Sequence, residues 1–160
     1  MKVVMFAAVL PIVLAVTPGF AGESCDRWSF GMLEDEGGPA ASAWVCPAAS
    51  EPSLLVHCEG SDSFFISYFE GGDPPNRDPG YEGKFEITIG DDTFRRNALF
   101  QAMDASIAIP KQKITGPLVA AMMSGERMSI KPMDGSHSGD SFALAGSTAA
   151  LKQLAATCGK

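Results

Sequence analysis

Short stretches of alternating apolar and polar residues fill the first two thirds of the chain. Such alternation places successive side chains on opposite faces of a β-strand. The clearest case is the segment 84–89, in which Phe85, Ile87 and Ile89 fall on one face. By the same criterion we predict further strands over residues 27–33, 42–46, 53–58, 63–69, 93–100, 105–109, 127–131 and 141–144.

The predicted strand 63–69 is apolar on both of its faces. Phe64, Ile66 and Tyr68 fall on one face, and Phe65 and Phe69 fall on the other. A strand of this kind either lies at the centre of a core or presents one face as a binding patch. We expect the central position, and we keep the second face as a candidate for ligand contact.

The last third of the chain changes to a helical period. Thr115 and Pro117 before an apolar run, with Gly125 after it, predict a short helix over 115–125. A second helix is predicted over 147–159, where apolar residues recur at spacings of three and four. Many short strands and two short helices together predict a mainly β fold, an antiparallel β-sandwich-like domain.

Glycine and proline are concentrated in the segment 70–83, which we predict to be a long loop. We expect this loop to be dispensable for folding, because long loops cost little extra closure entropy. It is also the candidate binding region, together with the aromatic face of the preceding strand. The candidate contact residues are Phe65, Phe69, Asp73, Asn76, Arg77, Asp78 and Tyr81.

The first 21 residues have the pattern of a secretory signal peptide. Lys2 is followed by an apolar run, and small residues stand at Gly19 and Ala21 before a polar segment. The apolar run is too short to span a bilayer. We therefore predict cleavage after Ala21, a single exported domain over 22–160, and a periplasmic or secreted location of the Gram-negative type.

Four cysteines follow the predicted signal segment, and an even number in an oxidising compartment predicts two disulfides. Their spacing contains no close pair of the kind that zinc sites use. Three pairings are possible. We favour Cys46 with Cys58, as a link between neighbouring strands, and Cys25 with Cys158, as a link between the two ends of the domain.

The chain is acidic, with a net charge of −7 from 12 basic and 19 acidic residues. Removing Lys2 with the signal segment leaves 11 basic against 19 acidic residues and a net charge of −8. Nucleic acids and anionic membranes bind clustered lysine and arginine, so this balance disfavours both. A cationic protein partner is compatible with it.

Residues suited to catalysis are scarce. His57 lies within a predicted strand, and His137 lies in a glycine- and serine-rich turn. A nucleophile elbow requires serine at the position that His137 occupies. The acidic segment 73–82 does not match a calcium-binding loop. We therefore predict a protein that is not an enzyme and that has no metal site and no cofactor.

The carboxyl-terminal half carries a recognisable pattern over residues 113–158. Ser124-Gly125 follows the first predicted helix, Phe142-Ala143-Leu144-Ala145-Gly146 forms a strand, and Ala150-Leu151 with Leu154 begins the last helix before Cys158. In this the chain resembles the invasion-associated locus B family of Gram-negative periplasmic proteins. The resemblance extends loosely to Trp44, Cys46 and Cys58, and the loop 70–83 departs from it. It implies an exported, disulfide-bonded, β-rich domain associated with host interaction, and it carries over no catalytic residue.

The expected function is accordingly that of an exported, non-enzymatic binding protein with a protein partner. The alternative is a small periplasmic inhibitor of a cationic enzyme such as lysozyme, which the negative charge and the loop 70–83 would suit.

Overall fold

A computed structural model describes residues 26–158 apart from 36, 47–52 and 73. The predicted signal segment, 1–21, lies outside the described residues. Its assignment stays a prediction.

Nine antiparallel strands form one sheet in this part of the chain, in the order β1-β2-β3-β4-β7-β6-β5-β8-β9. The first half contains β1 (Ser29–Asp35), β2 (Gly38–Val45), β3 (Ser53–Cys58), β4 (Ser63–Phe69) and β7 (Ser106–Lys113). The second half contains β6 (Asp92–Gln101), β5 (Glu82–Ile89), β8 (Arg127–Pro132) and β9 (Asp140–Ala143). Every predicted strand is present: 53–58 and 63–69 have the predicted bounds, and the ends of the others are shifted by a few residues.

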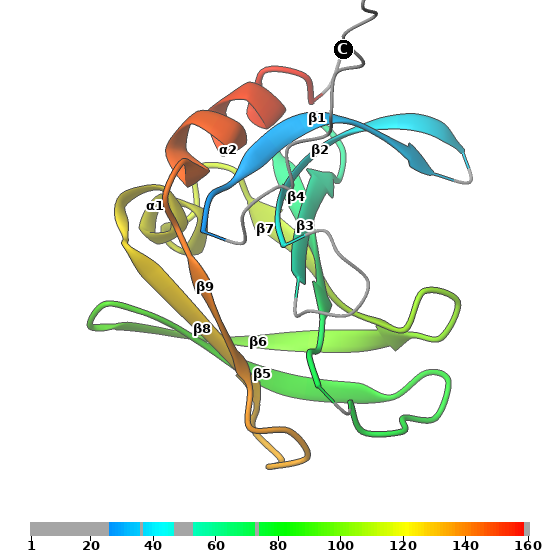
Figure 1. Cartoon of the computed structure of the whole chain (residues 1–160). Helices are drawn as coiled ribbons and strands as arrows, with labels where there is room; N and C mark the ends of the chain where they lie inside the picture. Colours follow the sequence, from blue (N-terminus) through cyan, green and yellow to red (C-terminus); the bar gives the residue numbers. More distant parts are fainter. Residues whose placement is uncertain (1–25, 36, 47–52, 73, 159–160) are drawn as a thin grey trace, which may run out of the picture.

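The sheet curls until its two halves face each other, as Figure 1 shows for β3 and β4 against β5 and β8. The ring of Tyr68 on β4 meets the ring of Phe142 on β9 edge to face at 6.1 Å. Near the two sheet edges, the Trp28 amide donates to the Ala145 carbonyl at 2.9 Å. The predicted mainly antiparallel β fold is confirmed, but the described residues form one curled sheet and not the two sheets of a sandwich.

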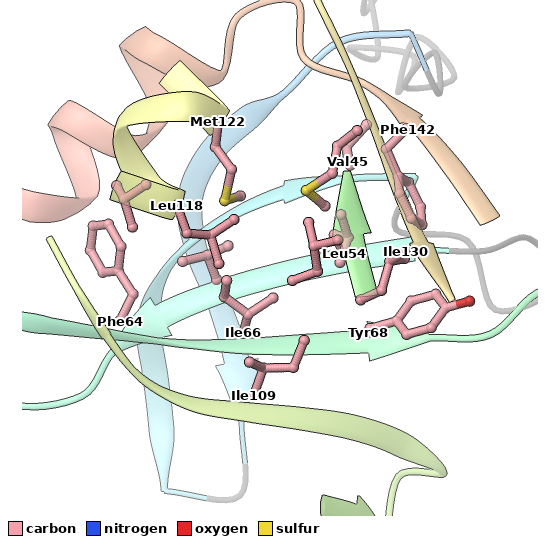
Figure 2. Packing of buried hydrophobic residues seen from close by; sticks show 14 of the residues in the cluster. Val45, Leu54, Phe64, Ile66, Tyr68, Ile109, Leu118, Met122, Ile130 and Phe142 are labelled. Atoms are coloured by element: carbon pink, nitrogen blue, oxygen red, sulfur yellow. The ribbon is translucent and has the colours of Figure 1, made fainter. Parts of the chain in front are cut away.

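The core fills the concave side of this sheet. From β4 it receives Phe64, Ile66 and Tyr68, each at most 2% exposed. Figure 2 shows Phe64 and Ile66 near Leu118 and Met122 of the first helix, and Tyr68 beside Ile130 and Phe142. The predicted inner face of the strand 63–69 is therefore the face that packs in the core.

Two helices, α1 (Pro117–Ser124) and α2 (Ser147–Ala155), cover one end of the curl (Figure 1). Both were predicted, but neither begins with a side-chain cap. Ser147 is instead buried, and its hydroxyl donates to the Met122 carbonyl at 2.7 Å. This hydrogen bond joins the start of α2 to α1. Within the described ranges, no helix is long and apolar enough to cross a bilayer.

The end of α1 requires glycine because the sheet approaches it closely. A Cβ atom at Gly125 would lie 2.4 Å from Cγ2 of Ile89 and 3.0 Å from the Ala121 carbonyl oxygen. Only a residue without a side chain fits here. Glycine is therefore needed at position 125 because there is no room for a side chain. A left-handed conformation is not the reason, since the φ of Gly125 is −80°.

The predicted disulfide pairing is wrong. Cys58 is bonded to Cys158, with their Cα atoms 5.4 Å apart. β2 and β3 are antiparallel, and Val45 lies opposite Leu54. Cys46 therefore stands beside the start of β3, whereas Cys58 stands at its end, about 16 Å away at roughly 3.3 Å per residue. A disulfide needs Cα atoms within about 7 Å.

The carboxyl-terminal helix explains the observed link. Leu151 and Leu154 are buried, and α2 packs against β1, β2 and β3. The turn after α2 thereby brings Cys158 to the end of β3. Cys46 is also disulfide-bonded, and no described cysteine is a free thiol. Cys25 lies outside the described residues.

We predict that the Cys58–Cys158 link contributes strongly to stability, because it closes a loop with a sequence separation of 100. Replacing both residues by serine should lower the free energy of unfolding by about 4 to 5 kcal/mol on the loop-entropy model. Denaturant unfolding measures the loss, and non-reduced peptide mapping checks the connectivity. Recovery of a Cys46–Cys58 peptide would contradict the pairing.

Candidate functional site

The outer face of β2, β3 and β4 carries a second set of large side chains. Ser42, His57 and Phe65 lie side by side across these three strands in the sheet register. They border a hollow of about 540 Å³, which we call the outer groove. Its lining residues are Leu33, Glu34, Ala40, Ser42, Leu55, His57, Cys58, Glu59, Phe65, Ser67, Phe69, Gln101, Met103 and Asp104.

Two hairpins bound the outer groove, and β3 and β4 form its floor. Leu33 belongs to the β1–β2 hairpin on one side, and Met103 belongs to the turn between β6 and β7 on the other. Phe65 and Phe69 of β4 are only partly buried, and Met103 is 86% exposed. The groove therefore offers aromatic and aliphatic surface that no described residue covers.

The charged residues of the outer groove are all acidic. Glu34, Glu59 and Asp104 line it, and no lysine or arginine of the described ranges does. Asp104 is held in place because its carboxylate accepts hydrogen bonds from the amide and the hydroxyl of Ser106, at 3.2 and 2.9 Å. An apolar floor with an acidic border suits a ligand that combines apolar surface with positive charge.

A serine and a histidine meet in the groove, which raises the question of catalysis. The Ser42 hydroxyl lies 3.0 Å from Nδ1 of His57. Ser42 is 0% exposed, and its hydroxyl also donates to the Ala40 carbonyl at 3.3 Å. A serine nucleophile must reach its substrate. The burial of Ser42 therefore argues against a role as nucleophile.

The predicted binding residues separate into two places. Phe65 and Phe69 line the outer groove. The predicted binding residues of the loop 70–83 instead border a different hollow of about 380 Å³, beside Asp134 and Ser136. They are Asn76, Arg77, Asp78 and Tyr81. Asp73 lies outside the described residues. The sequence prediction therefore joined two surfaces that the fold keeps apart.

Arg77 has a structural position that the sequence did not suggest. It forms a bidentate ion pair with Glu70, and the two side chains are 4% and 3% exposed. Its guanidinium also donates to the Ser136 hydroxyl at 3.2 Å and lies over the Tyr81 ring at 5.2 Å. The loop is thus tied into the interior, which argues against our expectation that it is dispensable for folding.

The loop after β8 completes this attachment. Tyr81 donates a hydrogen bond to Asp134, and His137 Nε2 lies 3.1 Å from the Gly71 carbonyl oxygen. Because the Gly139 amide donates to Nδ1 of His137 at 3.0 Å, the ring proton belongs on Nε2. These contacts make His137 a link between two loops. None of them presents it to a substrate.

Metal binding finds no support in the described part of the chain, where no three histidine, cysteine or carboxylate side chains gather as ligands. The prediction of a metal-free, cofactor-free protein remains a prediction. Glu34, Leu55, Met103 and Asp104 also line the groove and were not among the predicted binding residues. The alternation of polar and apolar residues assigns a face within each strand, but only the order of strands in the sheet brings these faces together.

Comparisons with protein-family models, with curated proteins and with solved structures gave no match for this chain.

We predict that Arg77→Met destabilises the fold by about 3 to 5 kcal/mol, because Glu70 would remain buried without its partner. The double variant Arg77→Met/Glu70→Gln should recover part of this loss, since it leaves no buried charge. Asp78→Asn, at an exposed neighbouring position, is the control and should stay within about 0.5 kcal/mol of the parent. Urea unfolding measures all three. Equal stability of Arg77→Met and the parent would contradict a structural role for the loop.

The Tyr81 hydrogen bond, together with those from Ser136, lowers the pKa of Asp134 from 3.8 to about 2. A carboxyl group with a depressed folded-state pKa stabilises the fold above its unfolded pKa, and this contribution disappears as the pH falls toward 2. Asp134→Asn should therefore be less stable than the parent at pH 6, and the difference should vanish near pH 2. Thermal midpoints across this range test it. A difference that does not change with pH would mean that the Asp134 charge is not involved.

Proposed function

We propose that this protein is an exported, non-enzymatic binding protein, and that its outer groove receives a basic segment of a partner protein. The segment would carry lysine or arginine beside an aromatic or aliphatic residue. The observation that supports this most is the composition of the groove, in which Phe65, Phe69 and Met103 provide apolar contact within an acidic border.

Size and edge geometry favour a peptide segment as the occupant. A hollow of about 540 Å³ accommodates a few side chains of an extended peptide. In the described residues β1 pairs with β2 alone, so its other edge offers backbone hydrogen-bonding groups next to the groove. A partner segment can add to such an edge as a further strand while its side chains enter neighbouring pockets.

Charge determines which partner this would be. Glu34, Glu59 and Asp104 contribute three negative charges around the groove, and the whole chain has a net charge of −7. A basic segment gains from both the local carboxylates and the long-range field. An acidic segment would meet repulsion on every side of the groove.

The non-enzymatic part of the proposal rests on Ser42 and His57. Their contact has the spacing of a catalytic pair, but the Ser42 hydroxyl is 0% exposed and already contacts both His57 and the Ala40 carbonyl, which argues against a role as nucleophile. Export is supported by the Cys58–Cys158 disulfide, since such bonds persist in oxidising compartments. A place in the invasion-associated locus B family remains part of the proposal.

The second candidate function is inhibition of a cationic enzyme such as lysozyme. It is favoured by the end of β6 and the turn that follows, where Leu99 of the strand is 41% exposed and Met103 of the turn is 86% exposed, next to Asp104. A protruding apolar turn with an acidic neighbour can enter a cleft on a basic enzyme. In that case the protein inserts into its partner, whereas in the first proposal the partner inserts into the groove.

A labelled peptide of alternating lysine and tryptophan tests the groove by fluorescence anisotropy. We predict that Glu34→Gln/Asp104→Asn weakens binding by roughly threefold to tenfold, because exposed ion pairs contribute about 0.2 to 1 kcal/mol each. Asn keeps the acceptor that Ser106 needs. The matched control, Asp91→Asn/Asp92→Asn, removes the same charge from the exposed β5–β6 turn and should leave binding unchanged.

Phe65→Ala should weaken the same peptide further, since it removes apolar contact that charge substitutions leave in place. Equal losses in the groove variant and in the control would mean that only net charge matters, which would contradict the site. Lysozyme activity measured with and without the protein separates the second candidate. Inhibition that Met103→Ser abolishes and Phe65→Ala leaves intact would favour the inhibitor.

A further inference from the structure

The sheet has a split between β6 and β7, and the residues around it are different from those that line the outer groove. These strands pair only through Leu99, Phe100 and Gln101 of β6 with Ala108, Ile107 and Ser106 of β7. Beyond these pairs they diverge, and Figure 1 shows β6 running toward the β5–β6 turn while β7 runs toward α1. A hollow of about 320 Å³ lies in the split.

The side chains at this hollow are predominantly basic. Arg96 of β6 and Lys111 and Lys113 of β7 line it, and none of the described acidic residues does. Gln112 and the first residues of α1 complete the lining, with Gly116, Pro117 and Leu118. We call this hollow the cationic cleft. It gathers three of the 12 basic residues of a chain whose net charge is −7.

Arg96 is held in position at the cleft by neutral groups. Its Nε donates to the side-chain oxygen of Gln112 at 2.8 Å, and its Nη1 donates to the Arg95 carbonyl at 2.9 Å. The guanidinium also lies over the Phe94 ring at 5.6 Å. Gln112 is itself buried, and its side-chain amide nitrogen Nε2 is held in place by donating to the Pro110 carbonyl at 2.6 Å. A guanidinium oriented in this way keeps its full charge and has further N–H groups to donate.

A β-bulge places Lys111 at the same cleft. The register between β4 and β7 shifts between Phe64 and Ile66, and Lys111 has a φ of 57°, which is uncommon for a residue with a side chain. The Glu59 carboxylate accepts the Lys111 amide hydrogen and thereby supports the bulge. Glu59 lines the outer groove and not the cleft, so it leaves the Lys111 ammonium group without a counter-charge there.

The three cations of the cleft are not neutralised within the described part of the protein. Arg96, Lys111 and Lys113 form no ion pair with a described carboxylate, whereas Arg77, Arg95 and Lys131 each do. Three unpaired cations around one hollow, one of them fixed by a buried glutamine, have the arrangement of a receptor for a multiply charged anion.

We propose that the cationic cleft binds a divalent phosphate group, either free or as the terminal group of a phosphate monoester. Arg96 would donate from its guanidinium to two phosphate oxygens, and the Lys111 and Lys113 ammonium groups would balance the remaining charge. This site is separate from the outer groove and has the opposite charge preference. The protein would then hold a basic peptide segment and a phosphate at different places.

Titration of the full chain with inorganic phosphate, at constant ionic strength in a phosphate-free buffer, tests the proposal by NMR amide shifts. We expect saturable shifts of Arg96, Gln112 and Lys113 with a Kd of about 1 mM or tighter. The variant Lys111→Gln/Lys113→Gln should weaken binding by roughly tenfold or more, since it removes two positive charges that attract the phosphate. The matched control, Lys84→Gln/Lys131→Gln, removes two exposed lysines from β5 and β8 and should bind as the parent does.

Glycerol phosphate under the same conditions distinguishes the two sources of the group. Binding of both compounds identifies an open site for phosphate monoesters, and binding of inorganic phosphate alone identifies a closed site for the free ion. Acetate should bind much more weakly. The proposal is overturned if phosphate gives no saturable shift, if acetate binds equally well, or if the cleft variant and its control lose affinity to the same extent.

Discussion

The hydrogen bond from the Tyr68 hydroxyl to the Asp140 carboxylate, 2.5 Å long, joins the middle of the sheet to its last strand. A nine-stranded sheet has too large an apolar face to leave in water, so it must fold back on itself. Tyr68 is 0% exposed, and its ring also meets Phe142 of β9. Burial, together with the bond to Asp140, raises the pKa of Tyr68, so the hydroxyl remains a donor. Asp140 also accepts from the Gly71 amide, which brings the loop after β4 to the same point.

Most of the secondary structure could be predicted from the sequence, because period and turn residues are local signals. Phe85, Ile87 and Ile89 are all buried, as their alternation predicts. The disulfides could not be assigned in this way. The predicted pairing of Cys46 with Cys58 assumed only that β2 and β3 are neighbours, and this assumption is correct. The pairing is nevertheless wrong, because the strand register places Cys46 and Cys58 at opposite ends of β3. The actual partner of Cys58 depends on where α2 packs, which the sequence pattern does not show.

The candidate site was predictable only in part, for a related reason. Phe65 and Phe69 were identified because both faces of β4 are apolar. Their neighbours Met103 and Asp104 follow β6, which reaches this surface only through its pairing with β7. Arg77 was misjudged because a charged residue in a proline-rich loop gives no local sign of burial. Its ion pair with Glu70 is found only when the fold is known, because the sequence does not show that the two side chains meet.

The two faces of β4 have different roles, one in the core and one at the surface. Phe64, Ile66 and Tyr68 maintain the interior, while Phe65, Ser67 and Phe69 border the outer groove. Alternate positions of this strand therefore meet different physical requirements. Substitutions at one set can alter which molecules the surface accepts while the fold is preserved by the other. Diversification of this surface during evolution can therefore proceed one residue in two, without compensating changes in the interior.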